Sequence, residues 1–218
     1  MRLSIYWTYG TNGGTLTAMT NSHTAHRPGP DPYAYLPQVP TFELASTSVT
    51  DGQPLPLEQL SGLLGVPGGQ DISPQLSWSG FPAGTESFVV SVYDPQAPTG
   101  SGFWHWVAAD IPAATTSQAA GAGIPGGAHL PDAALQLTAD AGAARYVGGA
   151  PPAGSGVHQY YITVTALSVP KIGLGQDASA AYLGFSIAGQ TLARATLICP
   201  TPAPAARRPH LVNPRARR

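Results

Sequence analysis

The chain lacks several features that define whole classes of protein. Its 218 residues include a single cysteine, Cys199, so no disulfide can form within the chain and a reducing compartment is expected. No stretch approaches the roughly 18 consecutive apolar residues of a membrane-spanning helix. The first residues show no apolar core of a secretory signal. These absences predict a cytoplasmic protein.

Charge is also scarce, at 10% of residues, and it is unevenly placed. Residues 200–218 hold five of the ten cations and no acid, which leaves residues 1–199 with a net charge of −6. An acidic body argues against nucleic-acid binding by the domain itself. Any anion site must therefore be built locally, from imidazole and backbone N–H groups, because no broad positive field exists.

Glycine and proline are abundant instead, with 26 and 23 residues and no repeating period. Together they predict a loop-rich fold dominated by β-structure. Helix formers between 178 and 195 predict one or two short helices, and the stretch 112–145 should be irregular, with a minor strand near 145–147. We expect a disordered leader at 1–37, one domain at 38–199 and a basic, disordered tail at 200–218. Apolar, β-branched and aromatic runs predict strands at 42–46, 76–78, 88–93, 103–111, 157–167 and 195–198.

Two similar segments concentrate the polar side chains. In the first, Asp94 precedes a Gly/Pro-rich loop that opens onto a strand with His105 near its start. In the second, a Gly/Pro-rich loop with Pro151 and Pro152 opens onto a strand carrying His158 and Tyr160. Loop–strand junctions of this kind can form a small pocket, and the spacing brings Asp94 and His105 to one sheet end if their strands are antiparallel neighbours.

Strand alternation assigns these side chains to faces. His158 and Tyr160 should share the face of 162, 164 and 166, and His105 should share that of Val107 and Ala109. The spacing does not say whether His158 joins Asp94 and His105, because the order of the third strand is open.

The motifs that carry these residues resemble those of the phosphatidylethanolamine-binding protein family, in its bacterial Raf-kinase-inhibitor-like branch. The similarity spans about residues 38–198. It includes Ser-Pro-Gln-Leu-Ser-Trp at 73–78, Asp-Pro-Gln-Ala-Pro at 94–98, Gly-Phe-Trp-His-Trp at 102–106, Pro-Pro at 151–152 and His-Gln-Tyr at 158–160.

The resemblance implies a β-sandwich with a large central sheet, a smaller sheet and short C-terminal helices. It also implies a pocket for phosphate or phospholipid head groups, with no cofactor or metal, and it is compatible with a homodimer. The ligand-binding residues carried over by motif are Asp94, His105, His158, Tyr160, Pro151 and Pro152. Gln96 departs from the family, which usually has a second aspartate there and hence another charge beside the pocket.

Other functions stay open beside anion binding. A protein-interaction module that inhibits a kinase or protease is the second reading. Two histidines and an aspartate also match some metal-dependent enzymes. Ser101 or Ser155 with His and Asp would match a serine hydrolase, although neither serine lies in a nucleophile elbow. Without such a motif, the chain is expected not to be an enzyme.

Overall fold

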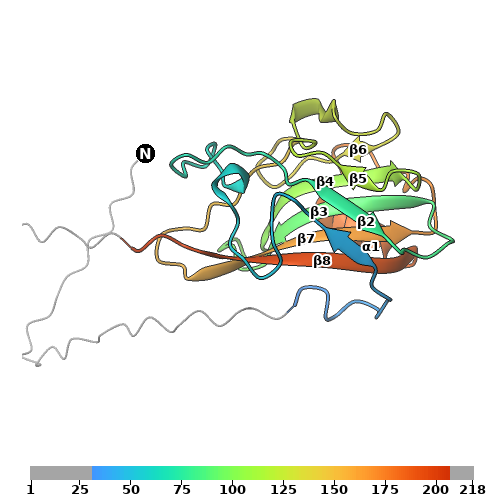
Figure 1. Ribbon diagram of the computed structural model, residues 1–218, viewed down its shortest axis with the longest axis horizontal. Helices are drawn as coiled ribbons and strands as arrows, with labels where there is room; N and C mark the ends of the chain where they lie inside the picture. Colours follow the sequence, from blue (N-terminus) through green and yellow to red (C-terminus); the bar gives the residue numbers. More distant parts are fainter. Residues whose placement is uncertain (1–30, 207–218) are drawn as a thin grey trace, which may run out of the picture.

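The computed structural model describes residues 31–206, which form two antiparallel sheets (Figure 1). This arrangement confirms the predicted β-dominated fold with one large and one smaller sheet. The large sheet has the order β6 (Leu135–Gln136), β4 (Phe103–Pro112), β3 (Ser87–Asp94), β7 (Val157–Leu167), β8 (Thr191–Pro202), and the smaller has β1 (Glu43–Ala45), β2 (Leu76–Ser79), β5 (Ser117–Gln118). The helical elements within 31–206 are one α-helix, α1 (Ala180–Ile187), and two 3-10 turns at Leu57–Gln59 and Pro125–Gly127.

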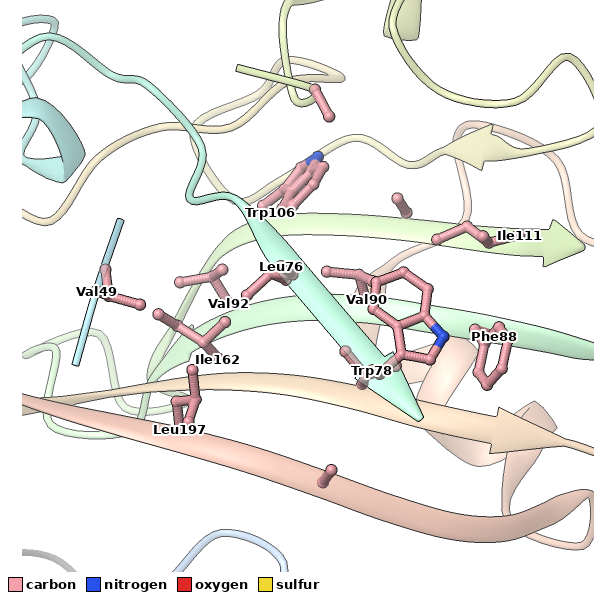
Figure 2. Packing of buried hydrophobic residues seen from close by; sticks show 14 of the residues in the cluster. Val49, Leu76, Trp78, Phe88, Val90, Val92, Trp106, Ile111, Ile162 and Leu197 are labelled. Atoms are coloured by element: carbon pink, nitrogen blue, oxygen red, sulfur yellow. The ribbon is translucent and has the colours of Figure 1, made fainter. Parts of the chain in front are cut away.

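The two faces of β3 are covered by different layers because successive side chains in a strand point in opposite directions. Phe88, Val90 and Val92 pack into the core beneath the small sheet, where β2 crosses β3 (Figure 2). There the rings of Trp78 and Phe88 meet edge to face at 5.3 Å. Val89 packs on the opposite face, in the cluster that contains Leu183 of α1.

The β3–β4 hairpin contains an irregularity that changes the site. Val92 pairs with Trp106 and Tyr93 pairs with Trp104, so His105 is an extra residue, a β-bulge. Beyond it, Val107 and Ala109 face the α1 side. The predicted grouping of His105 with Val107 and Ala109 is therefore wrong, because the bulge interrupts strict alternation.

Two further expectations have different outcomes. The helix expected within 178–195 is α1, which the Ser179 hydroxyl caps by accepting the Tyr182 N–H at 3.1 Å. The minor strand expected at 145–147 is absent. Tyr146 N–H donates to Gly123 and Val147 N–H to His105, so this segment has a different partner at each residue.

The expected domain limits differ from the structure at both ends. At the C-terminal end β8 continues to Pro202, past the expected start of the tail at 200. At the N-terminal end Tyr33 packs against Tyr161, with ring centroids 6.1 Å apart, inside the expected leader. Residues 1–30 and 207–218, where most of the leader and tail fall, lie outside the described residues.

Candidate functional site

Sheet order explains how three distant motifs meet. Strand β3 lies between β4 and β7 and is antiparallel to both. Its last residue, Asp94, therefore lies at the end where β4 and β7 begin, with His105, His158 and Tyr160. The hairpin placed Asp94 and His105 together as predicted, and the position of β7 next to β3 supplies the third element that spacing could not.

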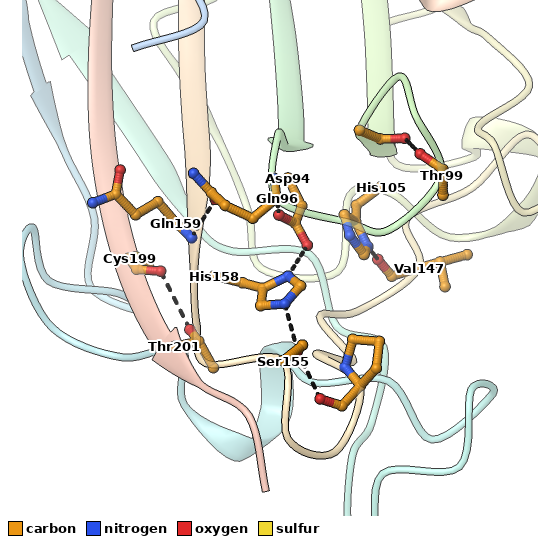
Figure 3. Close-up of polar contacts among 12 residues, drawn as sticks. Asp94, Gln96, Thr99, His105, Val147, Ser155, His158, Gln159, Cys199 and Thr201 are labelled. Carbon is orange, nitrogen blue, oxygen red and sulfur yellow. Dashed lines mark hydrogen bonds and ion pairs between the residues drawn. The ribbon is translucent and has the colours of Figure 1, made fainter. Parts of the chain in front are cut away.

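Asp94 and His158 form a buried pair at this end (Figure 3). Nδ1 of His158 lies 2.7 Å from Oδ2 of Asp94. The other carboxylate oxygen accepts the Gln96 N–H at 2.9 Å. The Asp94–His158 pair is the only side-chain ion pair within residues 31–206.

Ser155 extends this pair into a chain of hydrogen bonds. Its Oγ lies 2.7 Å from Nε2 of His158 and 2.6 Å from the carbonyl oxygen of Pro152 (Figure 3). Both ring nitrogens of His158 thus have side-chain partners. Ser155 was recognised in the sequence only as a candidate nucleophile, and its contact with His158 depends on a loop turn that spacing does not specify.

His105 occupies a different environment in the same site. Its Nδ1 lies 2.8 Å from the carbonyl oxygen of Val147, and the ring is buried. Burial lowers the pKa of His105, and the Val147 carbonyl and the Asp94 charge only partly offset that. His105 is therefore neutral near pH 7 and donates its Nδ1–H to Val147.

Tyr160 lies beside His105, with ring centroids 5.2 Å apart and the rings edge to face. Its hydroxyl is buried and forms no hydrogen bond of normal geometry within residues 31–206. Burial raises its pKa, as does the Asp94 charge, and the nearby Ala150 N–H offsets this slightly. Tyr160 therefore keeps its proton throughout the physiological range, and no group within residues 31–206 accepts it.

Asp71 and its three hydrogen-bond donors, named here the Asp71 latch, hold the segment that carries Val147. Asp71 accepts hydrogen bonds from Gly148 N–H at 2.8 Å, Ser61 Oγ at 2.7 Å and Leu63 N–H at 3.0 Å. Burial opposes the charge of Asp71, but these three donors outweigh it and lower the pKa of the carboxyl. Nothing in the sequence marked Asp71, because its partners lie up to 77 positions away.

The two prolines predicted at the rim differ in exposure: Pro151 is buried and Pro152 is exposed.

Gln96 has a structural contact that the sequence did not indicate. Its Oε1 accepts the Gln159 N–H at 2.8 Å and ties the 95–102 loop to β7. An aspartate here would place a second carboxylate near Asp94, whereas the amide adds no charge.

A metal centre is not assembled from these residues. Within residues 31–206, no three His, Cys, Asp or Glu side chains are grouped so that they could hold a metal ion. Asp94 and His158 bond each other instead, and His105 is turned to a backbone carbonyl.

Comparison with known proteins identifies the fold and the motifs together. The family model described as phosphatidylethanolamine-binding protein matches residues 45–201. The chain belongs to the phosphatidylethanolamine-binding protein family. The UPF0098 protein YbhB of Escherichia coli is 43% identical over 158 residues, 72% of this chain and 97% of YbhB.

Solved structures agree with this assignment. The crystal structure of E. coli YbcL, described as a member of the mammalian PEBP family, matches with a TM-score of 0.71 at 38% identity. That match covers 73% of this chain and 97% of YbcL. The phosphatidylethanolamine-binding protein of Plasmodium vivax, at 13% identity and a TM-score of 0.51, covers 79% of this chain and 92% of its own, and shares the fold.

The comparisons leave the predicted cytoplasmic location as a proposal. A Mycobacterium tuberculosis relative, 31% identical over 149 residues (66% of this chain and 67% of that protein), is named as a lipoprotein, LppC. Within residues 31–206 the α-helical structure amounts to the eight residues of α1, too few to cross a bilayer.

Proposed function

We propose that this protein binds a small anion of the phosphate-head-group type at the Asp94–His158 end of the large sheet. The observation that carries the proposal is the buried Tyr160 hydroxyl, a donor with no acceptor among residues 31–206. Buried donors are costly unless they are paired, and an oxyanion supplies the missing acceptor.

Hydrogen counting supports a positive charge on His158. Ser155 has one hydroxyl proton and two close partners, at 2.6 and 2.7 Å. If Ser155 donates to the Pro152 carbonyl, His158 must donate from Nε2 as well as to Asp94 from Nδ1. In that arrangement His158 would be an imidazolium that balances the charge of Asp94, and the site would not repel an anion.

The same count disfavours the serine-hydrolase alternative. Ser155, His158 and Asp94 are spaced like a catalytic triad, but a general base needs a lone pair on Nε2. With the Ser155 proton on Pro152 and a proton on Nε2, no base is available. Stoichiometric labelling of Ser155 by a fluorophosphonate would reverse this assignment.

His105 gives the proposed binding a pH dependence. It is neutral without ligand because burial lowers its pKa. An anion beside the ring favours the protonated form, so binding should be accompanied by proton uptake near pH 7. Affinity should therefore weaken as pH rises.

Calorimetric titration with phosphate and phosphoethanolamine tests the proposal, with Tyr160→Phe and Tyr161→Phe as a matched pair. Tyr161 has its hydroxyl bonded to Gln159 at 3.0 Å and is separated from the site by strand alternation. Loss of the Tyr160 hydroxyl should weaken binding about tenfold or more, and loss of the Tyr161 hydroxyl should not. Equal affinities in both variants, or no saturable binding to wild type, would reject an oxyanion at Tyr160.

A second candidate function is a protein-interaction module that inhibits a kinase or protease. Surface-loop variants of such a module would lose the protein partner and would still bind the anion. We also retain as proposals a non-enzymatic role, a homodimer and the absence of nucleic-acid binding by the domain.

A further inference from the structure

The face of the large sheet away from β1 and β2 carries a separate cavity of about 470 Å³. Its walls come from β3, β4, β7, β8, α1 and residues 32–39. The stacked rings of Tyr93 and Trp104, 4.2 Å apart, form part of the wall. These two residues adjoin Asp94 and His105 in sequence but point to the other face, so the cavity is distinct from the anion site. Its volume is typical of small-molecule sites.

The mouth of this cavity is apolar on both sides. Phe185 of α1 is 80% exposed, and Leu36 on the opposite rim is 39% exposed. Leu183 and Val89 line the interior. Large apolar side chains left in water around a concave site indicate a surface that binds an apolar group.

One cation lies within this apolar lining. Arg194 of β8 places its guanidinium 4.8 Å from the centre of the Tyr33 ring, and it is half-buried. No carboxylate within residues 31–206 lies within 4.0 Å of it. The charge of Asp31 acts on Arg194 from beyond that distance, and its Oδ1 accepts the Tyr33 N–H at 2.8 Å. A half-buried cation without an ion-pair partner is complementary to an anionic group.

We propose that this cavity binds an anionic amphiphile with a single apolar chain, such as a medium-chain fatty carboxylate. The apolar chain lies between α1 and residues 32–39, and the carboxylate pairs with Arg194. Charge complementarity at Arg194 selects this occupant over a neutral apolar molecule or a cationic one.

Gly184 of α1 offers a position from which a side chain can fill the cavity. A Cβ added at Gly184 or at Gly189 would meet no atom within 4 Å, and neither has a positive φ. Only Gly184 lines the cavity. Gly184→Leu should therefore occupy the space, with Gly189→Leu as the matched control.

The experiment is calorimetric titration of the full chain with decanoate below its micellar concentration, compared with decyltrimethylammonium. We expect saturable decanoate binding in wild type and Gly189→Leu, and none in Gly184→Leu. Arg194→Gln should weaken decanoate binding about tenfold, whereas Arg145→Gln, whose side chain bonds the Tyr146 carbonyl, should not. Phosphate titrations should be the same in Gly184→Leu and wild type, so this proposal and the anion site fail separately.

Several outcomes would overturn the proposal. Undiminished decanoate binding in Gly184→Leu would place the ligand elsewhere, and equal binding of decyltrimethylammonium would remove the role of Arg194. Sedimentation showing a dimer in wild type that Gly184→Leu dissociates, without decanoate binding, would assign the cavity to a second copy of the chain.

Discussion

The loops that open onto β4 and β7 are alike in sequence but give their histidines opposite environments. His158 of β7 has a carboxylate on one ring nitrogen and a hydroxyl on the other. His105 of β4 has a backbone carbonyl on Nδ1, and burial lowers its pKa. A Gly/Pro loop with a histidine therefore specifies where an imidazole lies, whereas the surrounding strands and loops decide which groups its ring nitrogens bond.

The largest expected effect comes from removing the charge that distinguishes the β7 junction. Asp94→Asn leaves His158 buried without its carboxylate, and we expect a loss of about 3 kcal/mol in the free energy of unfolding. Urea denaturation measures it, with the exposed Asp132→Asn as control. A loss below about 1 kcal/mol, the value of an ordinary surface ion pair, would mean that the pair is not ionic.

The β4 junction depends instead on the Asp71 latch. Asp71→Asn removes the charge of the carboxylate that accepts three hydrogen bonds. Asparagine still suits the positive φ of 55° at this position. We expect a loss of about 2 kcal/mol, and the exposed Glu58→Gln should be neutral. Because the folded-state pKa of Asp71 is lowered, its contribution is present above the unfolded-state pKa and is lost as pH falls through the folded value. An Asp71→Asn protein with wild-type stability at pH 7 would show that the latch does not hold the segment.

Much of this architecture follows from the sequence. The runs at 88–93, 103–111 and 157–167 predicted β3, β4 and β7, because β-branched and aromatic residues mark strands clearly. Asp94 and His105 were placed at one end by a single hairpin. The second loop–strand segment singled out His158 and Tyr160, and the family motifs pointed to the same residues. The structure brings both to that end.

Long-range contacts account for what was missed. The bulge at His105 inserts one residue and so changes the face on which the following side chains lie. Strict alternation does not predict this effect. The irregular segment 145–149 is held by Asp71 and by a bridge between Leu60 and Gly149, so local propensity at 145–147 misled. Ser155 reaches His158 only through the turn that its own N–H closes onto Pro152 at 3.0 Å.

A smaller effect should come from His105, whose lowered pKa makes stability depend on pH. The folded-state pKa of His105 lies below that of the unfolded chain, so between these values the unfolded state binds more protons. Stability should therefore fall as pH drops below about 6.5, the unperturbed histidine value. His105→Gln, which can still donate to Val147, should flatten this slope, whereas the exposed His129→Gln should leave it unchanged. An unchanged slope in His105→Gln would assign the acid sensitivity to other groups.

The smallest effect should come from Ser155→Ala. This change removes the acceptor for His158 Nε2, but Ser155 is only half-buried, so water can take its place. We expect a loss of about 0.5–1 kcal/mol, far below that of Asp94→Asn, because the ion pair and its bond to Nδ1 remain. Urea denaturation measures this loss beside that of Asp94→Asn. If Ser155→Ala instead matched Asp94→Asn in stability, the hydroxyl would be as important as the carboxylate, and the β7 junction would be a neutral hydrogen-bonded chain like that of His105.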